Sequence, residues 1–395
     1  MDRIRVEEYA ATIAELVETR LAGDAVAVPL AKARDRVLAD DVASPIDLPP
    51  FRNSQMDGYA VRTDQLPPPG EPLRVTGIIA AGETGRLPGG AVVKIMTGAP
   101  LPDDADAVVP VEHVEHLPGE RIALAGEVRR GDFVRERGSD VRAGTVIVPA
   151  GTRLRARHLA AIAAAGLATV AVRERVRVAV ISTGRELVAP GDALGTGRIP
   201  DANGVALAAA AEADGAEVVY VGRAGDDPAA VARELEAARA AGARIVMTSG
   251  GISMGDFEPV RALVEDHSGV VGTVDMQPGG PQAHAVVDGT PLVAFPGNPV
   301  SAQVSYALFV SPLLRAAASL PPAARHALPL AEAVRFAPGR RRFLRGRLLG
   351  DGSVAVVGGT GSHLVTAMAA ADVLVDLPPE VGDLPAGALV DSVEL

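Results

Sequence analysis

Between residues 175 and 320, runs of strand-forming residues alternate with helical segments. Predicted strands cover residues 175–181, 217–221, 244–248 and 292–295, and predicted helices cover 205–213, a segment from Pro228, and 299–318. The segment from Pro228 has a clear start, because Asp227 stands at the N-cap and proline at the first helical position. Strands alternating with helices of this length specify a parallel, doubly wound sheet. We therefore expect an α/β multidomain protein containing such a sheet.

The remainder of the chain contains two β-rich regions. Residues 45–149 and 328–395 consist of short apolar runs separated by Pro and Gly turns, which is typical of all-β structure. Predicted helices over 3–22 and 153–167 flank the first region. The expected domains are an α/β domain from 1–26 and 175–320, a hinge from 27–44 and 145–174, a β-rich insert domain over 45–144, and a small C-terminal β-barrel over 325–395.

Composition excludes several functional classes. The chain has 49 acidic and 38 basic residues, and the resulting net charge of -11 argues against nucleic-acid and anionic membrane partners. The absence of cysteine excludes disulfides, thiolate nucleophiles and Cys-type metal sites. The N-terminus lacks the apolar core of a signal peptide, and the most apolar stretch is shorter than the roughly 18 residues that a membrane span needs. We expect a soluble, cytoplasmic protein.

Three polar loops directly follow predicted strands. They are Ser182–Glu186, Gly225–Pro228 and Ser249–Asp256. Ligands of an open parallel sheet bind beyond the carboxyl ends of its strands, so all three loops are expected at one edge. The small residues Ser249, Gly250, Gly251 and Ser253 would let backbone amides approach an anion closely, as in a phosphate-binding nest. The alternative is a tight turn that binds nothing.

The same loops carry carboxylates, at Glu186, Asp226, Asp256 and Glu258. Magnesium prefers oxygen ligands of this kind and shares them with substrate phosphates, because it keeps several of its waters. Taken singly, each carboxylate is better explained as a helix cap or a solvated loop charge, and Asp227 is assigned to capping. As a group, the carboxylates indicate a divalent-cation site.

A possible anion site also lies at the start of the helix predicted over 299–318. The sequence Pro296-Gly297-Asn298-Pro299 follows a predicted strand and places Asn298 at the N-cap and Pro299 at the first helical position. A helix start offers free N–H groups and a positive dipole end to an anion. A well-capped helix without a ligand explains the segment equally well.

Other polar groups have simpler interpretations. Asp57-Gly58 and Thr97-Gly98 are typical of ordinary hairpin turns. His113 and His116 lie three apart in a predicted strand and would face opposite sides, so they form a poor metal pair. Arg340, Arg341, Arg342 and Arg345 form either a surface run or an anion clamp, and the surface run is favoured for the first three.

Taken in order, eight segments form a specific set that covers nearly the whole chain. They are residues 53–60, 94–99, 137–154, 182–187, 201–203, 225–228, 249–255 and 296–301. In this order they resemble the molybdopterin molybdenumtransferase family, which includes MoeA and the gephyrin E domain. The resemblance implies that the parallel-sheet domain is molybdopterin-binding-like.

The resemblance also implies a reaction and partners. The reaction is insertion of molybdate into the dithiolene of adenylylated molybdopterin, with Mg²⁺-dependent cleavage of the adenylate and release of AMP. The implied assembly is a homodimer in which the parallel-sheet domain of one subunit faces the β domain of the other. The upstream molybdopterin adenylyltransferase is the implied transient partner.

Residue roles follow from the resemblance position by position. Catalytic roles fall on Asp57, Thr97, Asp140, Glu186, Asp226 and Glu258. Binding roles for the substrate fall on Ser249, Gly250, Gly251, Pro296 and Pro299. The loop after the third strand and the helix start described above add Ser253, Gly297 and Asn298 to this binding set. Glu186 and Asp226 are the expected Mg²⁺ ligands, and the partner subunit's Asp57 would orient the pterin or the attacking group.

The chain departs from the family pattern in three places. Glu258 stands where the family usually has Asp, which adds a methylene group. The segment 276–281 resembles the family's Lys-Pro-Gly-Lys-Pro, but Gln277 and Gly280 occupy the two cationic positions. The loss of these charges weakens the expected affinity for phosphate or molybdate unless another Arg takes their place.

Two alternative functions follow from these departures and from the fold. The first is a catalytically weakened paralogue that acts as a molybdopterin-binding or scaffold dimer. The second is a generic sugar-phosphate or nucleotide enzyme, which rests on fold analogy alone and leaves the N-terminal β motifs unexplained. Retention of the other acidic positions favours the transferase.

Overall fold

The computed structural model describes residues 3–253, 255 and 258–395. The chain forms two compact units, one from Met1–Val26 and Arg173–Leu395 and the other from Ala27–Val172. Each unit has its own sheets and its own buried core. The finer division into four domains stays a prediction. None of the helices in the described ranges combines the length and apolar character needed to cross a bilayer.

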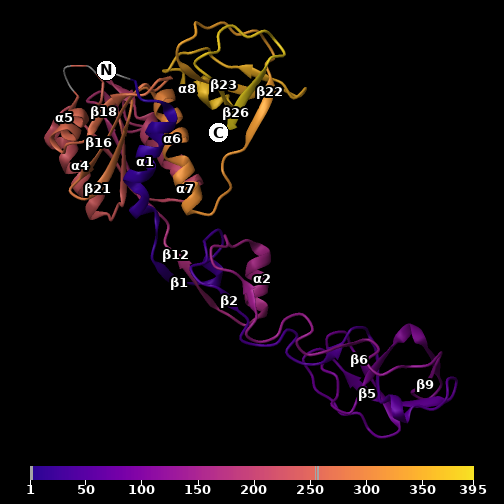
Figure 1. The fold of residues 1–395 in the computed structure, drawn as a ribbon. Coiled ribbons are helices and arrows are strands. Elements are labelled where there is room, and N and C mark those ends of the chain that lie inside the picture. The colour runs from indigo at the N-terminus through magenta and orange to yellow at the C-terminus, as the bar shows by residue number, and fades with distance from the viewer. Residues whose placement is uncertain (1–2, 254, 256–257) are drawn as a thin grey trace. The chain divides into compact units, whose positions relative to one another are not determined.

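A six-stranded sheet is the centre of the first unit (Figure 1). In spatial order its strands are β16 (Glu217–Ala224), β13 (Arg177–Thr183), β17 (Ile245–Ser249), β21 (Thr290–Phe295), β20 (Pro281–Val287) and β18 (Val270–Thr273). The first four strands are parallel, as the doubly wound sheet predicts. Strand β20 is antiparallel to both of its neighbours, so the sheet is mixed rather than wholly parallel.

The antiparallel strand β20 has a local sequence signal that the prediction did not use. Asp288 and Gly289 alone connect β20 to β21, and both have positive φ, at 47° and 79°. Asp-Gly in this conformation is the type I′ turn that joins two antiparallel strands into a tight hairpin. The antiparallel pair therefore follows from two residues between apolar runs.

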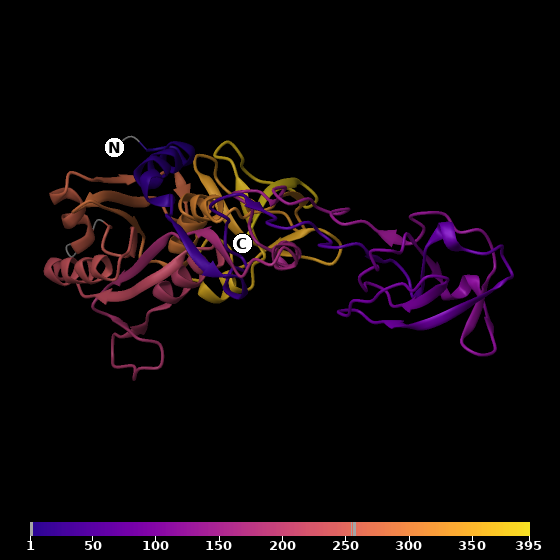
Figure 2. The ribbon, with the colours of Figure 1, turned by 90° about the horizontal axis from the view of Figure 1, so that it is seen from below.

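Helices cover both faces of this sheet. In β13, Val178 and Val180 pack in one core cluster while Ala179 and Ile181 pack in another, because successive side chains point to opposite faces. The first cluster includes residues of α1 (Val6–Leu21), α3 (Ala202–Ala213), α6 (Pro299–Phe309) and α7 (Ser311–Ala317), and the second includes residues of α4 (Pro228–Ala240) and α5 (Pro259–Asp266). Figures 1 and 2 show the indigo helix α1 beside the orange α6 and α7, on the side of the sheet away from α4.

Two predicted helices differ from those observed. Helix α3 begins at Ala202 rather than Val205, because Asp201 caps it: Oδ1 of Asp201 accepts a hydrogen bond from the Gly204 amide at 2.9 Å. The single helix predicted over 299–318 is two helices, α6 and α7, which meet at Val310. Pro312 explains the break, since it has no amide to continue the helical hydrogen bonding.

The second unit is mainly β structure, as predicted for residues 45–149. Its six-stranded sheet has the spatial order β7 (Ala107–Pro110), β4 (Gly58–Val61), β6 (Ala91–Ile95), β5 (Pro72–Ile79), β9 (Arg121–Leu124) and β8 (Val114–Leu117). The short 3₁₀ helices η2 (Thr63–Gln65) and η3 (Val111–His113) lie in the connections between its strands. His113 therefore lies in η3 and His116 in β8, so the prediction that they share one strand is wrong.

Short ladders and one helix complete the second unit and its connection to the first. The ladders pair β1 (Ala25–Pro29) with β12 (Thr169–Arg173), β2 (Val42–Ala43) with β11 (Val146–Val148), and β3 (Asn53–Ser54) with β10 (Val134–Arg135). The 3₁₀ helix η1 (Leu30–Lys32) and helix α2 (Ala156–Ala164) lie between them in the sequence. Helix α2 falls within the Ala-rich segment predicted over 153–167.

The C-terminal region forms a second sheet in the first unit. The sheet has the order β19 (Met276–Gln277), β23 (Arg341–Leu348), β25 (Val373–Leu377), β26 (Leu389–Glu394) and β22 (Arg325–Pro329), and β24 (Val354–Val356) also pairs with β23. Helix α8 (Val365–Ala369) precedes β25. Elsewhere in the first unit, β14 (Leu187–Val188) and β15 (Ile199–Pro200) form a two-stranded ladder between β13 and α3 of the chain. Strand β19 belongs to the chain segment of the α/β part, so its pairing with β23 joins the two parts.

Candidate active site

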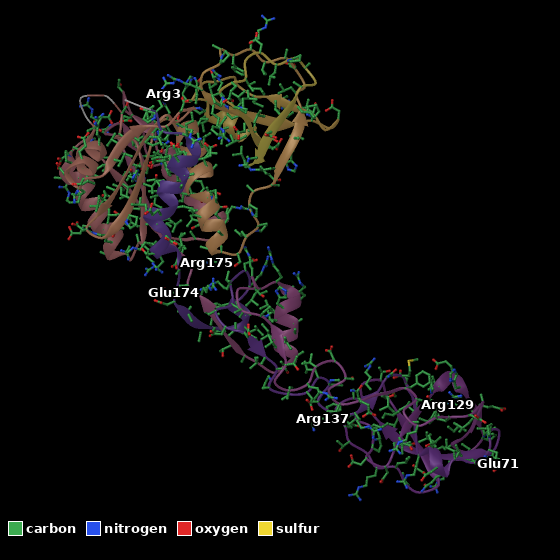
Figure 3. All side chains as sticks on the ribbon, viewed as in Figure 1. Arg3, Glu71, Arg129, Arg137, Glu174 and Arg175 are labelled. Atoms are coloured by element: carbon green, nitrogen blue, oxygen red, sulfur yellow. The ribbon has the colours of Figure 1, made fainter. Side chains whose placement is uncertain are left out.

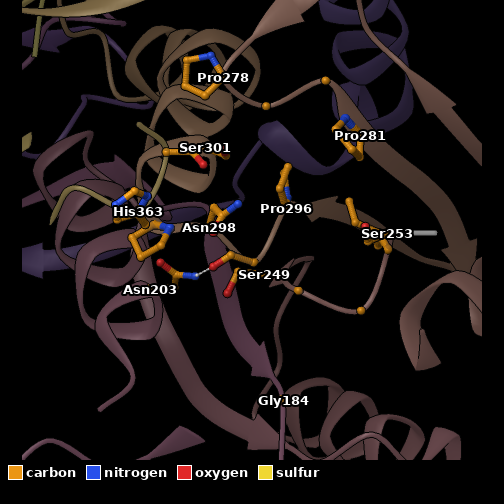
Figure 4. A pocket seen from close by; sticks show the side chains of 18 of the residues that line it. Gly184, Asn203, Ser249, Ser253, Pro278, Pro281, Pro296, Asn298, Ser301 and His363 are labelled. Carbon is orange, nitrogen blue, oxygen red and sulfur yellow. Dashed lines mark hydrogen bonds between the residues drawn. The ribbon is translucent and has the colours of Figure 1, made fainter. Parts of the chain in front are cut away.

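A cavity of about 940 Å³ lies at the carboxyl ends of the parallel strands. The loops that follow β13, β17 and β21 line it, together with residues 273–281 and part of the C-terminal segment 360–365. Figure 4 shows Ser249, Ser253, Pro296 and Asn298 around this common space. The structure thus brings together the loops that the sequence places at one edge of the sheet.

Glu186 and Asp226 both line this cavity. They follow β13 and β16, which are paired so that Thr183 lies beside Ala224. Oδ1 of Asp226 accepts a hydrogen bond from the Arg185 amide at 3.2 Å, and the Arg185 guanidinium lies 3.5 Å from Oδ2. The Glu186 carboxylate forms no hydrogen bond with any residue in the described part of the chain, so it remains available to a ligand.

The acidic residues fit a shared metal ion rather than an all-protein metal cage. Within the described residues there is no group of three or more His, Cys, Asp or Glu side chains placed to hold a metal. Magnesium commonly takes one or two protein carboxylates and completes its shell with waters and phosphates, and Glu186 and Asp226 are carboxylates of this kind at the cavity wall. Asp256, which the sequence adds to this group, lies outside the described residues.

One backbone amide of the loop after β17 forms a hydrogen bond within the protein. The Gly250 amide donates to the Phe295 carbonyl at 3.0 Å and so joins this loop to the end of β21. This corrects the expectation that the Gly250 amide is open to an anion. The amides of Gly251 and Ile252, by contrast, have no acceptor among the residues that the structure describes. The predicted nest is therefore reduced to these two donors.

Glu258 fastens the same loop. Its Oε2 accepts a hydrogen bond from the Ser253 amide at 2.8 Å, and its Oε1 accepts one from the Gly255 amide at 3.2 Å. Both carboxylate oxygens therefore stabilise the turn between β17 and α5. The catalytic role expected for Glu258 stays a prediction.

The start of α6 offers fewer donors than expected. Asn298 is the N-cap and Pro299 the first helical residue, as predicted, but Asn298 makes no side-chain capping bond. Pro299 has no amide, and the Val300 amide donates to the Ser362 carbonyl at 3.1 Å. Of these first-turn amides, that of Ser301 alone lacks an acceptor within the described ranges. Ser301 also lines the cavity.

Sequence reasoning assigned no role to two buried polar residues that organise the site. Nδ2 of Asn203 donates to the Gly297 carbonyl at 2.8 Å, the dashed bond in Figure 4. Oδ1 of Asp201 accepts from the Ser182 hydroxyl at 2.9 Å as well as capping α3. These bonds tie the start of α3 to the ends of β13 and β21. An Asp before an Ala-rich helical segment is a recognisable cap signal.

Asp57, Thr97 and Asp140 belong to the second unit and are not among the residues that line this cavity. Thr97 donates its amide and its hydroxyl to Oδ1 of Asp57, each at 2.7 Å. These two bonds hold the pKa of the exposed Asp57 carboxyl below its ordinary value. Asp140 is exposed and donates its amide to the Leu48 carbonyl at 2.9 Å. Hydrogen bonds thus connect Asp57 with Thr97, and neither of these two bonds involves Asp140.

The arginine run before and within β23 is mostly not a surface run. Arg341 forms a two-bond ion pair with Asp376, at 2.7 Å for both bonds, and also contacts Glu7. Arg342 is buried and donates to the carbonyls of Ala337 at 2.6 Å and Arg340 at 3.3 Å. The surface interpretation is therefore wrong for Arg341 and Arg342. Arg340 is exposed and lines the cavity.

Arg345 holds the C-terminal loop that contributes to the cavity. It is buried and donates to the carbonyls of Val357, Gly358, Gly359 and Gly361, at 2.7 to 3.2 Å. No carboxylate pairs with it in the described part of the chain, and burial lowers its pKa. These bonds fix the backbone on both sides of Thr360, which together with Ser362 and His363 lines the cavity.

Three family models match successive parts of the chain. The MoeA N-terminal region (domain I and II) matches residues 4–166, the probable molybdopterin binding domain matches 179–316, and the MoeA C-terminal region (domain IV) matches 327–395. With the fold and the cavity, these matches define a transferase of molybdenum cofactor biosynthesis. The chain belongs to the molybdopterin molybdenumtransferase family, the MoeA proteins.

Individual relatives agree with this assignment over most of their length. The chain is 39% identical over 398 residues to molybdopterin molybdenumtransferase 2 of Mycobacterium tuberculosis H37Rv, covering 97% of each chain. It is 35% identical over 356 residues to the molybdopterin molybdenumtransferase of Synechococcus elongatus, covering 87% of each. The crystal structure of a MoeA protein from Pyrococcus horikosii matches all of this chain and 99% of its own, with a TM-score of 0.83 and 32% identity.

Proposed function

We propose that this chain inserts molybdate into the dithiolene of adenylylated molybdopterin, with Mg²⁺-dependent cleavage of the adenylate and release of AMP. The observation that supports this most directly is the single cavity lined by Glu186, Asp226 and the loop of Gly251 and Ile252. Carboxylates beside open backbone amides can bind a divalent cation together with a phosphate. The family membership supplies the substrate class.

Each part of the cavity has a role in this proposal. Glu186 and Asp226 would hold Mg²⁺, which when bound would stabilise negative charge developing at phosphorus. The amides of Gly251, Ile252 and Ser301 would donate to phosphate oxygens. Asn203 would keep the Pro296–Pro299 turn in place through the Gly297 carbonyl.

The chemical balance is simple. Cleavage breaks the phosphoanhydride bond and consumes one water, which gives AMP and molybdopterin with its own terminal phosphate. Insertion forms two Mo–S bonds, and one oxygen of molybdate leaves as water with the two protons of the dithiol. No electron donor or acceptor is needed for either step.

The proposed active form is a homodimer in the cytoplasm. Asp57 and Thr97 are positioned together in the second unit, and the resemblance implies that this unit of one subunit faces the cavity of the other. Asp57 of the partner subunit would then orient the pterin or the attacking group. The upstream adenylyltransferase would deliver the adenylylated substrate.

The test measures AMP release from adenylylated molybdopterin with molybdate and Mg²⁺. Glu186→Gln and Asp226→Asn should abolish the release while circular dichroism stays unchanged. The matched control is Asp227→Asn: Asp227 caps α4 through the Ala229 amide at 3.1 Å, and asparagine also caps helices well. Full turnover by both cavity variants would refute the assignment of the metal ligands.

A scaffold function is the second candidate, because Gln277 and Gly280 line the cavity without positive charge. In that case the wild-type chain would bind adenylylated molybdopterin but release no AMP at any Mg²⁺ concentration. Measuring binding and AMP release on the same preparation separates the two functions.

A further inference from the structure

We infer that Gln282 is a positioning residue, whose buried side chain holds residues 276–281 against helix α6 and so shapes one wall of the cavity for the substrate. Gln282 is itself not among the residues that line the cavity. The inference rests on the proposed function, from which it takes the substrate, adenylylated molybdopterin. It adds a residue that acts on binding through the backbone of its neighbours.

The segment 276–281 lines the cavity along its whole length. Figure 4 shows Pro278 and Pro281 of this segment beside the same space as Ser249. Its tip consists of Gly279 and Gly280, and Gly279 has a φ of 98°, a backbone conformation that favours glycine. The tip therefore has no side chain of its own with which to bind the rest of the protein.

Other contacts already hold the two sides of this segment. Strand β19 pairs with β23, and the Val274 amide donates to the Gly280 carbonyl at 2.7 Å. Just before β19, Asp275 forms an ion pair with Arg3, labelled in Figure 3, at 3.1 Å. These contacts leave the position of Gly279, between β19 and Gly280, to be fixed.

Gln282 fixes Gly279. Its Nε2 donates to the Gly279 carbonyl at 2.7 Å and to Oγ of Ser305 in α6 at 2.6 Å. Gln282 and Ser305 are both fully buried. A Cβ added at Gly279 would lie 3.0 Å from Oγ of Ser305, so the backbone at Gly279 packs closely against α6. One side-chain amide therefore joins the tip of the segment to this helix.

The orientation of the Gln282 amide follows from its partners. A carbonyl oxygen only accepts hydrogen bonds, so the Gly279 carbonyl requires Nε2 on its side. Oε1 of Gln282 then has no hydrogen-bond partner in the part of the chain that the structure describes. An unpaired buried acceptor opposes stability. Both bonds that Gln282 does form fix the segment, which supports a role in the geometry of the wall.

This geometry links two walls of the cavity. The first turn of α6 carries Pro299 and Ser301, which line the cavity as the segment does. A preorganised wall reduces the conformational freedom that is lost when a ligand binds. Glu186 and Asp226 follow other strands and form no hydrogen bond with Gln282 in the described structure. Loss of the Gln282 amide should therefore weaken substrate binding.

The test is calorimetric titration of the full-length protein with adenylylated molybdopterin. Gln282→Met keeps the length of the side chain and removes its donor, and it should raise the Kd about tenfold. The number of binding sites per chain should stay the same. A merely structural role would instead lower the fraction of chains that bind and leave the Kd of the folded ones unchanged.

The matched control is Gln303→Met. Gln303 also lies in α6, but its Nε2 donates to the Pro299 carbonyl one turn back in the same helix, at 3.3 Å, and not to the segment. Its substitution should leave the Kd unchanged.

Ser305→Ala is a milder second variant, which carries the test if Gln282→Met does not fold. It removes one of the two acceptors of the Gln282 amide, so the Kd should rise by a smaller factor. Adding Ser305→Ala to Gln282→Met should have little further effect, because the shared bond is already lost. In both single variants the amides of residues 276–281 should exchange with solvent faster, while those of the loop at 249–253 stay unchanged.

Three results would overturn the inference. They are an unchanged Kd in the folded variants, a weaker affinity without faster exchange in residues 276–281, and an equal loss of affinity in Gln303→Met.

AMP release measured on the same preparations separates this inference from the proposed function. A wild type that releases AMP, with a Kd independent of Gln282, keeps the function and overturns the role of Gln282. A wild type that binds the substrate but releases no AMP, with a Kd that depends on Gln282, does the reverse. A wild type that neither binds nor releases overturns both.

Discussion

Thr97 donates two hydrogen bonds to one carboxylate oxygen of Asp57, from its amide and from its hydroxyl, both at 2.7 Å. The residues are 40 positions apart, and each belongs to a turn that looks ordinary by itself. Together the bonds stabilise the charged carboxylate and orient it on an exposed surface. The pair therefore presents a fixed negative charge rather than two unrelated turns.

Thr97→Ala should raise the pKa of Asp57 toward its ordinary value, because the hydroxyl bond is lost while the amide bond remains. A pH titration followed by NMR measures this shift. A depressed carboxyl pKa stabilises the fold above the unfolded-state pKa, and this stabilisation is lost as pH falls through the folded-state pKa. The two proteins should thus differ in stability near neutral pH and converge in acid. Thr76→Ala is the control, since its hydroxyl bonds only the Val92 carbonyl; an unshifted Asp57 in Thr97→Ala would contradict the prediction.

Gly250→Ala should destabilise the protein more than Gly191→Ala. Both glycines have positive φ, at 90° and 96°, so both substitutions strain the backbone by about 1–2 kcal/mol. A Cβ at Gly250 would also lie 2.6 Å from the Thr183 carbonyl oxygen, whereas nothing lies within 4 Å at Gly191. We expect this overlap to add about 1–3 kcal/mol. Urea unfolding midpoints of the two variants measure the difference, and equal midpoints would show that the loop gives way freely.

Asp201→Ala should cost about 2–3 kcal/mol, because it removes the cap of α3 and leaves the buried Ser182 hydroxyl without its acceptor. Asp201→Asn should cost less, since an amide oxygen can still cap the helix. Asp192→Ala, at an exposed position, serves as the control. Thermal unfolding in calorimetry gives the ranking, and a harmless Asp201→Ala would remove this residue from the organisation of the site.

Tyr306→Phe and Asp214→Ala should differ strongly in cost although they touch the same contact. Asp214 accepts hydrogen bonds from the Tyr306 hydroxyl at 2.7 Å and from Arg315 at 2.9 Å. Tyr306→Phe removes one bond, for about 1 kcal/mol. Asp214→Ala leaves a partly buried guanidinium without its carboxylate partner and a buried hydroxyl without its acceptor, for about 3–5 kcal/mol. Denaturant unfolding of both variants and of the double variant measures the coupling. Similar losses in the two single variants would contradict this account.

The sequence alone predicted those features of the fold and of the site that depend on residues close together in the chain or on the order of the strands. The Asp227 cap, the parallel strands and the gathering of Glu186, Asp226 and Gly250 at one edge follow from local patterns and from sheet topology. The use of individual donors does not follow, because it depends on which distant group arrives beside them. The Gly250 amide donates to the Phe295 carbonyl. The Val300 amide donates to the carbonyl of Ser362, which lies 62 residues further along the chain.

Long-range ion pairing escaped prediction for the same reason. A run of arginines looks solvated until Asp376 and Glu7 are brought against Arg341 by the fold. The Asp288-Gly289 hairpin is a different case, since its signal was local and sufficient. The prediction of a parallel sheet relied on the alternation of strands and helices. It did not use this turn, which specifies an antiparallel strand.

Strand β19 has only two residues, yet its backbone pairs with β23 of the C-terminal sheet. The chain then continues into β20 of the sheet at the centre of the first unit. Moving the C-terminal region outward would first have to break the backbone pairing between β19 and β23. This pairing therefore restrains the wall of the cavity that Met276 and Gln277 line.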